Sequence, residues 1–161
     1  MPAAEWRKAL ALAVLAITAA PAAADTPVTV EELGGSQCYA HGQLAGGPKG
    51  LVVDSAADYA KLFDPALRRQ SCSAADATKT IVPVDFTHKT VLGFWTAASC
   101  ADAGFDHRVL RDDAGKLLRY TVIIRPGPKP ACMGPGPESL NLIAIDKTPP
   151  GYKIVFDTVH E

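Results

Sequence analysis

The chain contains four cysteines, Cys38, Cys72, Cys100 and Cys132. Each thiol could act as a nucleophile, bind a metal or form half of a disulfide. No two of them stand in the close spacing of a zinc knuckle or of a C-x-x-C redox motif. Cys132 lies in RPGPKPACMGPGP (125–137), whose prolines and glycines exclude a helix or a central strand. The spacing therefore supports neither a zinc site nor a redox motif.

The N-terminal segment predicts which compartment holds these thiols. Two basic residues precede the apolar run Ala9–Ala20, which is too short to span a bilayer. Small residues then precede Asp25, so we expect a signal peptide over residues 1–24 with cleavage before Asp25. A retained membrane anchor is the alternative. No cysteine stands at the cleavage site, and we therefore expect a periplasmic or secreted protein without a membrane anchor after signal cleavage.

Export favours disulfides, because an oxidising compartment pairs an even number of thiols. Four cysteines can pair in three ways. We favour Cys38 with Cys72 and Cys100 with Cys132. Each bridge would close a loop of about thirty residues and stabilise the fold by roughly 3 to 4 kcal/mol.

The charge balance excludes two classes of partner. The chain has 16 Lys and Arg against 17 Asp and Glu, without a basic cluster. This balance offers no attraction to nucleic acid or to an anionic membrane. Residues 25–161 are enough for a single domain with its own core, and no motif for a cofactor is present.

One segment has the periodicity of a helix. Ser55 can cap it, Asp58 stands three residues further on, and Pro65 ends or bends it. Apolar residues at helical spacing are Tyr59, Leu62 and Phe63.

The rest of the chain predicts strands separated by turns. The RDDAGK segment (111–116) has the composition of a hairpin connection. Expected strands are 27–33, 51–55, 79–86, 89–97, 105–110, 117–124, 139–146 and 152–159. The pattern predicts a mainly β (α+β) fold, either an antiparallel β-sandwich or an open barrel, with one helix packed on it.

The histidines and carboxylates are the other candidates for catalysis. Nothing in the spacing of His41, His88, His107 and His160 ties one of them to a cysteine. A histidine on a strand, such as His107, is more often packed or hydrogen-bonded than a ligand. Asp85 has an apolar setting, but an Asp before a turn usually caps the backbone. We expect no enzymatic activity and no catalytic residue.

The proline-rich loop 126–137 is the predicted contact surface. A disulfide at its base and its own prolines would restrain it, so it would lose little entropy on docking. We assign partner binding to Lys129, Pro130 and Met133. An ordinary connection between strands is an equal alternative. The loop could also enter a protease cleft as an inhibitor, although Pro130 after Lys129 would make a poor scissile position.

A small-ligand or copper-binding envelope protein is a further alternative. Its candidate ligands are His41, His107, His160 and Met133, a soft set that suits copper. Their spacing follows no known pattern, so we assign neither a metal site nor a cofactor.

Four segments span about residues 51–159, namely LVVDSAADYAKLF, VPVDFTHKTVLGFWTA, HRVLRDDAGKLLRYTVIIRPGP and YKIVFDTV. Together they resemble the C-terminal domain family of PrcB, the protease-complex subunit. The resemblance implies one PrcB-like domain over 25–161, without catalytic residues. In the founding case the domain belongs to an accessory protein that stabilises a subtilisin-like protease.

The chain departs from that family in two respects. It has no lipidation cysteine, and it carries Cys100 where the family often has a glycine-rich turn with an aromatic residue. The resemblance would place this turn near the proline-rich loop, and so Cys100 near Cys132. We therefore expect a non-catalytic interaction or stabilising domain that serves a protease or another envelope protein.

Overall fold

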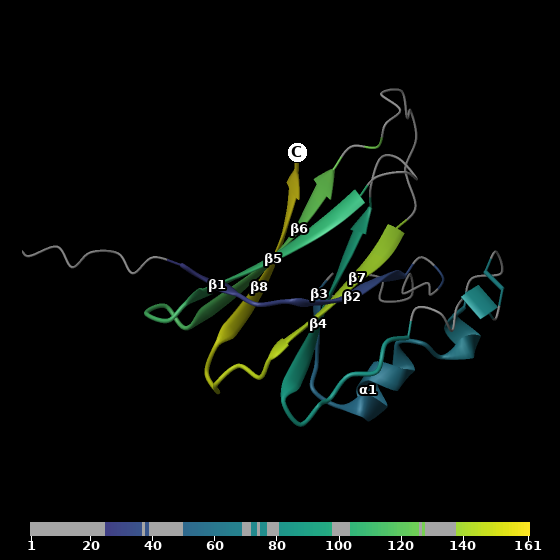
Figure 1. Cartoon of the computed structure of the whole chain (residues 1–161), viewed down its shortest axis with the longest axis horizontal. Coiled ribbons are helices and arrows are strands. Elements are labelled where there is room, and N and C mark those ends of the chain that lie inside the picture. Colours follow the sequence, from purple (N-terminus) through teal and green to yellow (C-terminus); the bar gives the residue numbers. More distant parts are fainter. Residues whose placement is uncertain are drawn as a thin grey trace, which may run out of the picture.

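The computed structural model describes most of the predicted domain as two sheets and a helical layer (Figure 1). The residues described are 25–36, 38, 50–68, 72–73, 75–76, 81–97, 104–125, 127 and 138–161. The predicted signal peptide, 1–24, lies outside them. Within these ranges, no helix has the length and apolar character needed to cross a membrane.

The first sheet, sheet A, has the strand order β1-β5-β6-β8. Its strands are β1 (Thr26–Val28), β5 (Gly104–Asp112), β6 (Leu117–Arg125) and β8 (Lys153–His160). β5 and β6 form the predicted hairpin, in whose turn Asp112 accepts a hydrogen bond from the Gly115 amide at 2.9 Å. β8 lies parallel to β6, because the chain passes through the second sheet between these two strands.

The second sheet, sheet B, is antiparallel throughout. Its strands, in spatial order, are β2 (Glu31–Ser36), β7 (Glu138–Asp146), β4 (Lys89–Ala97) and β3 (Gly50–Val53). The chain crosses from sheet A to sheet B between β1 and β2. At the opposite side, a Cβ on Gly50 would lie 2.2 Å from the Phe156 ring, so the close approach of β3 and β8 requires glycine there. Each sheet has two open edges, so neither closes into a barrel. Of the two predicted alternatives, the β-sandwich is the one confirmed.

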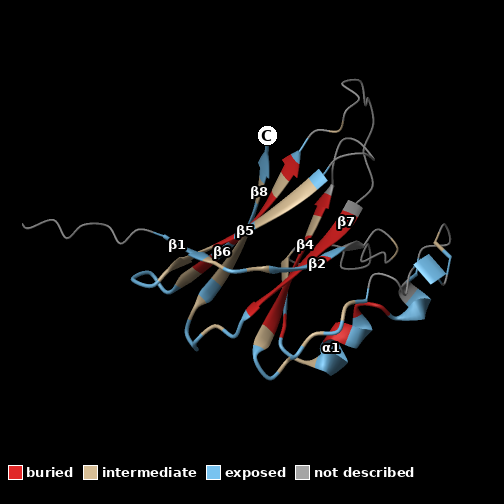
Figure 2. Ribbon diagram, viewed as in Figure 1, coloured by how far each residue is buried: buried red, intermediate tan, exposed pale blue. Residues whose placement is uncertain are grey.

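The main core lies between the two sheets (Figure 2). Strands β4 and β7 are buried on both faces, so their sequences read as nearly continuous apolar runs. Aromatic rings fill the centre, with Phe94 and Tyr120 respectively 5.5 and 6.0 Å from the ring of Phe156. Buried residues of this core are Leu92, Phe94, Val109, Leu118, Tyr120, Val122, Ile124, Ile143 and Ile145.

A helical layer covers the other face of sheet B. It contains α1 (Ala56–Lys61) and the 3-10 helix η1 (Pro65–Leu67). Ser55 caps α1 as predicted, accepting from the Asp58 amide at 3.1 Å and donating to the Asp58 carboxylate at 2.8 Å. The three apolar residues of the predicted helical face, Tyr59, Leu62 and Phe63, are buried in a second core against sheet B.

Two predicted strands are wrong. The expected single strand 27–33 is divided between β1 in sheet A and β2 in sheet B. Residues 81–85 of the expected strand 79–86 have no strand structure, and Pro83 lacks the amide that a ladder needs. The segment instead packs Val82, Val84 and Phe86 against the second core. The Tyr59 hydroxyl donates to the Val82 carbonyl at 3.1 Å, so the alternating pattern reflects packing on α1.

Candidate functional site

A disulfide joins Cys38 to Cys72, with 5.6 Å between their Cα atoms. This agrees with the pairing favoured from the sequence. Cys38 follows β2 and packs against the second core, while Cys72 follows η1. The bond therefore ties the helical layer to an edge strand of sheet B.

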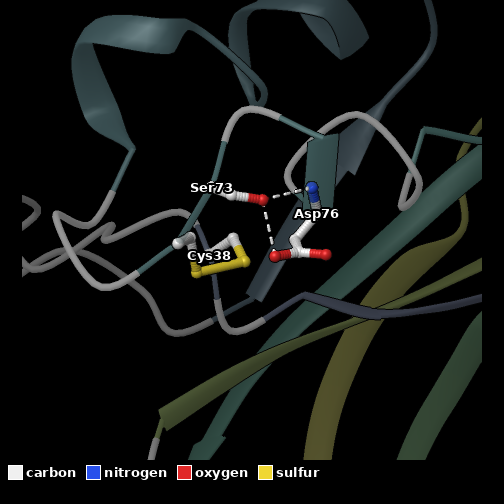
Figure 3. The surroundings of a disulfide bond; sticks show 4 residues. Cys38, Ser73 and Asp76 are labelled. Carbon is white, nitrogen blue, oxygen red and sulfur yellow. Dashed lines mark hydrogen bonds between the residues drawn. A yellow bond between two sulfur atoms is a disulfide. The ribbon is translucent and has the colours of Figure 1, made fainter.

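Polar groups beside this disulfide shape the local backbone (Figure 3). The Ser73 hydroxyl donates to the Asp76 carboxylate at 2.6 Å and accepts from the Asp76 amide at 3.0 Å. The arrangement repeats that of Ser55 and Asp58 at the start of α1. The serine and aspartate next to the sulfurs thus have the geometry of the capping pair of α1.

Cys100 and Cys132 lie outside the described residues, as do Lys129, Pro130 and Met133. The strand ends that flank the two cysteine-bearing segments are described. Ala97 pairs with Glu138 and Gly104 pairs with Arg125, so both segments begin and end at the same end of the sandwich. This placement supports the prediction that Cys100 pairs with Cys132.

We expect no free sulfhydryl in the denatured mature protein. The cysteines of both favoured disulfides cannot react with a thiol reagent. Proteolytic mapping should find Cys38 linked to Cys72 and Cys100 linked to Cys132. A single thiol with high reactivity near neutral pH would contradict the pairing and return Cys100 or Cys132 to the candidates for catalysis.

His107 is the centre of a polar cluster between the sheets. Its side chain is 5% exposed, and its Nδ1 lies 2.5 Å from the Glu32 carboxylate. Its Nε2 lies 3.3 Å from Oδ1 of Asn141. Both ring nitrogens therefore lie against side-chain oxygens of sheet B. A residue of β5 in sheet A thus joins two strands of sheet B.

Asn141 fixes this arrangement from the β7 side. Its amide, 1% exposed, donates to the Thr96 hydroxyl at 2.7 Å and to the backbone oxygens of Phe94 and Ser139. The Tyr120 hydroxyl donates to the Asn141 carbonyl at 3.3 Å. Burial, and to a lesser degree the charge of Glu32, raise the pKa of Tyr120 far above its usual value. The cluster is a satisfied internal network that links the two sheets.

The structure bears out the expectation that His107 is packed and hydrogen-bonded. Of the other candidate copper ligands, only His160 is described, and it ends β8 as an exposed residue. His41 and Met133 lie outside the described residues. Within the described part of the chain, no three residues of the types His, Cys, Asp and Glu gather as a metal site would require.

The sequence did not identify Glu32, Asn141 or Tyr120 as partners of His107. Asn141 had a detectable signal, because it is a polar residue inside the apolar run of β7. Glu32 had none, because 75 positions separate it from His107.

Asp85 caps the turn that leads into β4. Its carboxylate accepts from the Thr87 amide at 2.9 Å, from the Thr87 hydroxyl at 2.5 Å and from His88 Nδ1 at 2.8 Å. The hydrogen bonds from His88 and Thr87 hold the pKa of Asp85 well below its usual value. The predicted backbone cap is confirmed.

Asp85 should add an acid-sensitive contribution to stability. Because its pKa is lower in the folded state than the reference value of 3.8, the ionised carboxylate favours folding above about pH 4, and this contribution is lost as the pH falls further. Asp85→Asn should therefore reduce the loss of stability between about pH 5 and pH 2. Urea midpoints measured across that range test this. Parallel curves for the variant and the wild type would contradict it.

Charged and apolar side chains alternate on the outer face of sheet A. No described helix or strand packs on it, whereas α1 and η1 cover the outer face of sheet B (Figure 1). Strand register places Leu110, Arg119 and Val155 in one row, and Arg108, Thr121 and Asp157 in the next. Residues on this face are Asp106, Arg108, Leu110, Asp112, Leu117, Arg119, Thr121, Ile123, Lys153, Val155, Asp157 and Val159.

Two arginines, one on β5 and one on β6, are exposed charges of this face. Arg108 and Arg119 are exposed, and neither forms an ion pair within the described residues. A shallow hollow of about 50 Å³ lies beside Arg119 and is lined by Leu110 and Leu117 together with Asp25 and Asp112. Arginine next to half-buried apolar side chains is typical of protein interfaces.

Comparison with known proteins gave no match: no family model, curated protein or solved structure matches the chain. The resemblance to the PrcB domain family stays a prediction. A function for the chain therefore rests on the side chains described above.

Proposed function

We propose that the chain is a non-catalytic protein-binding module of the periplasm or the extracellular space, and that it binds its partner through the outer face of sheet A. The observation that supports this most is the pair Arg108 and Arg119, exposed and without ion pairs in the described residues, beside Leu110 and Val155.

The chemistry of the face indicates a partner with exposed carboxylates. A guanidinium can bind a carboxylate through two parallel hydrogen bonds. The neighbouring Leu110, Ile123 and Val155 are partly exposed, and they would exclude water from those ion pairs once a partner covers them. We therefore expect an acidic patch with apolar surroundings on the partner.

The disulfide and the predicted signal peptide support the location. Disulfides persist in oxidising compartments, and Cys38–Cys72 joins two layers of this fold. An accessory role toward a protease or another envelope protein is part of the proposal. Lys129, Pro130 and Met133 remain a second candidate surface. The pairing of Ala97 with Glu138 favours it, because this pairing supports the predicted Cys100–Cys132 disulfide that would restrain the loop.

Reversing both arginines should abolish partner capture. We expect Arg108→Glu/Arg119→Glu to recover at least about tenfold less partner from an extract of the host's envelope and medium, since losing hot-spot contacts costs 2 kcal/mol or more. Quantitative mass spectrometry of the captured proteins measures this.

The matched control is Arg68→Glu/Lys147→Glu, which changes the net charge equally at two exposed residues away from this face. The control should capture as the wild type does. Equal losses in both variants would indicate a net-charge effect and contradict the proposal, as would full capture by the Arg108/Arg119 variant. Thermal unfolding of each variant verifies that the fold is intact.

A further inference from the structure

Strand β8 is an open edge of sheet A. β6 pairs with one side of it, and no described strand pairs with the other. The amides of Lys153 and Glu161 donate toward β6, to Lys116 and Ile124. By alternation, the amides of Ile154, Phe156 and Thr158 face outward, and that of Thr158 is occupied by the Asp157 carboxylate at 2.8 Å.

The sequence of β8 is nearly symmetric about Val155. Ile154 and Phe156 flank it on the inner face, and Lys153 and Asp157 flank it on the outer face with opposite charges. Both charged side chains are exposed, and neither forms an ion pair within the described residues. This symmetry makes the edge complementary to itself.

We propose that β8 pairs with β8 of a second copy of this chain, antiparallel and centred on Val155. Lys153 then lies opposite the partner's Asp157, and Asp157 lies opposite the partner's Lys153. Ile154 exchanges backbone hydrogen bonds with the partner's Phe156. The two copies of sheet A form one continuous sheet.

Charge complementarity selects this register among those that the outward amides allow. Centring the pair on Asp157 would place two carboxylates opposite each other, which is unfavourable. Centring it on Phe156 would place Asp157 opposite Val155, and centring it on Ile154 would place Asp157 opposite Gly151. Only the register centred on Val155 places both Lys153 and Asp157 opposite a residue of opposite charge on the partner strand.

Lys153, Val155 and Asp157 also belong to the outer face of sheet A, but this pairing is made through the backbone edge of β8, whereas Arg108 and Arg119 lie on β5 and β6. The two proposals are therefore tested at different residues. The contact involves one short strand from each copy, which is fewer residues than a standard interface has. We therefore expect a weak dimer that forms at concentrations of about 10 μM to 1 mM, in the range of transient complexes.

Charge exchange tests the pairing. In sedimentation equilibrium the wild-type mass should rise toward that of a dimer. Lys153→Asp and Asp157→Lys should each weaken association by about tenfold, because both place like charges opposite each other twice. The double variant Lys153→Asp/Asp157→Lys should restore it. A monomeric wild type throughout the range, or a double variant as weak as the singles, would overturn the proposal.

A cysteine scan tests the register independently. In this pairing Val155 lies opposite the partner's Val155 as a non-hydrogen-bonded pair, with Cα atoms about 4.5 Å apart, which is within disulfide range. Mildly oxidised Val155→Cys should give a covalent dimer. Val159→Cys, on the same face but more exposed, should not, since it lies opposite the partner's Gly151. Equal cross-linking of both variants, or of neither, would overturn this register.

Discussion

Replacing Tyr120 by alanine is expected to lower the free energy of unfolding by about 3 to 5 kcal/mol, the range for deleting a large buried aromatic side chain. The Tyr120 side chain is fully buried between the sheets. Its ring contacts those of Phe94, His107 and Phe156, with centroids 6.0 to 6.4 Å apart. Deletion leaves a cavity that residues from both sheets would have to fill.

Tyr120→Phe separates packing from hydrogen bonding. It keeps the ring and removes the hydroxyl that donates to the Asn141 carbonyl, so we expect a loss of about 1 kcal/mol. Urea unfolding of both variants measures the difference. A loss below about 1 kcal/mol for Tyr120→Ala would contradict the description of this residue as the centre of the core.

Replacing Cys38 and Cys72 by serine should lower the free energy of unfolding by about 3 to 4 kcal/mol, given the 34 residues that separate them. The bond joins the helical layer to β2. Its removal frees the chain between these residues in the unfolded state. It also removes a restraint on the layer that packs Tyr59, Leu62 and Phe63 against sheet B.

The effect should be largest near the bond. Hydrogen exchange should show faster opening of α1 and β2 than of β5 and β6, because sheet A does not contain the bridge. The matched control is the same double substitution at Cys100 and Cys132, which should leave the protection of α1 unchanged. Uniform loss of protection across both sheets in the Cys38/Cys72 variant would contradict a local role for the bond.

Local chemistry explains why much of the fold could be predicted. Ser55, Asp58 and Pro65 determine where α1 begins and ends through contacts within a few residues. Strands β4 and β7 are buried on both faces and therefore carry apolar runs without ambiguity. The hairpin of β5 and β6 follows from its turn residues, including Gly115.

Other features depend on contacts between distant segments. The alternation in 79–86 predicted a strand, because a segment that packs against a helix can have the same apolar period. The contact of His107 with Glu32 depends on which strands face each other. The alternation of apolar and polar residues around Leu110 and Arg119 is visible in the sequence. Which sheet face stays uncovered is not, because it depends on where α1 packs.

The most direct test of the central claim, that the outer face of sheet A binds a protein partner, is photo-cross-linking in the native host. A benzophenone amino acid at Leu110, on this face, should give one discrete adduct with another protein. The same group at Ile81, an exposed apolar residue of the segment that packs on sheet B, should give none. An adduct from Ile81 or from Lys129 in the proline-rich loop, with none from Leu110, would contradict the account.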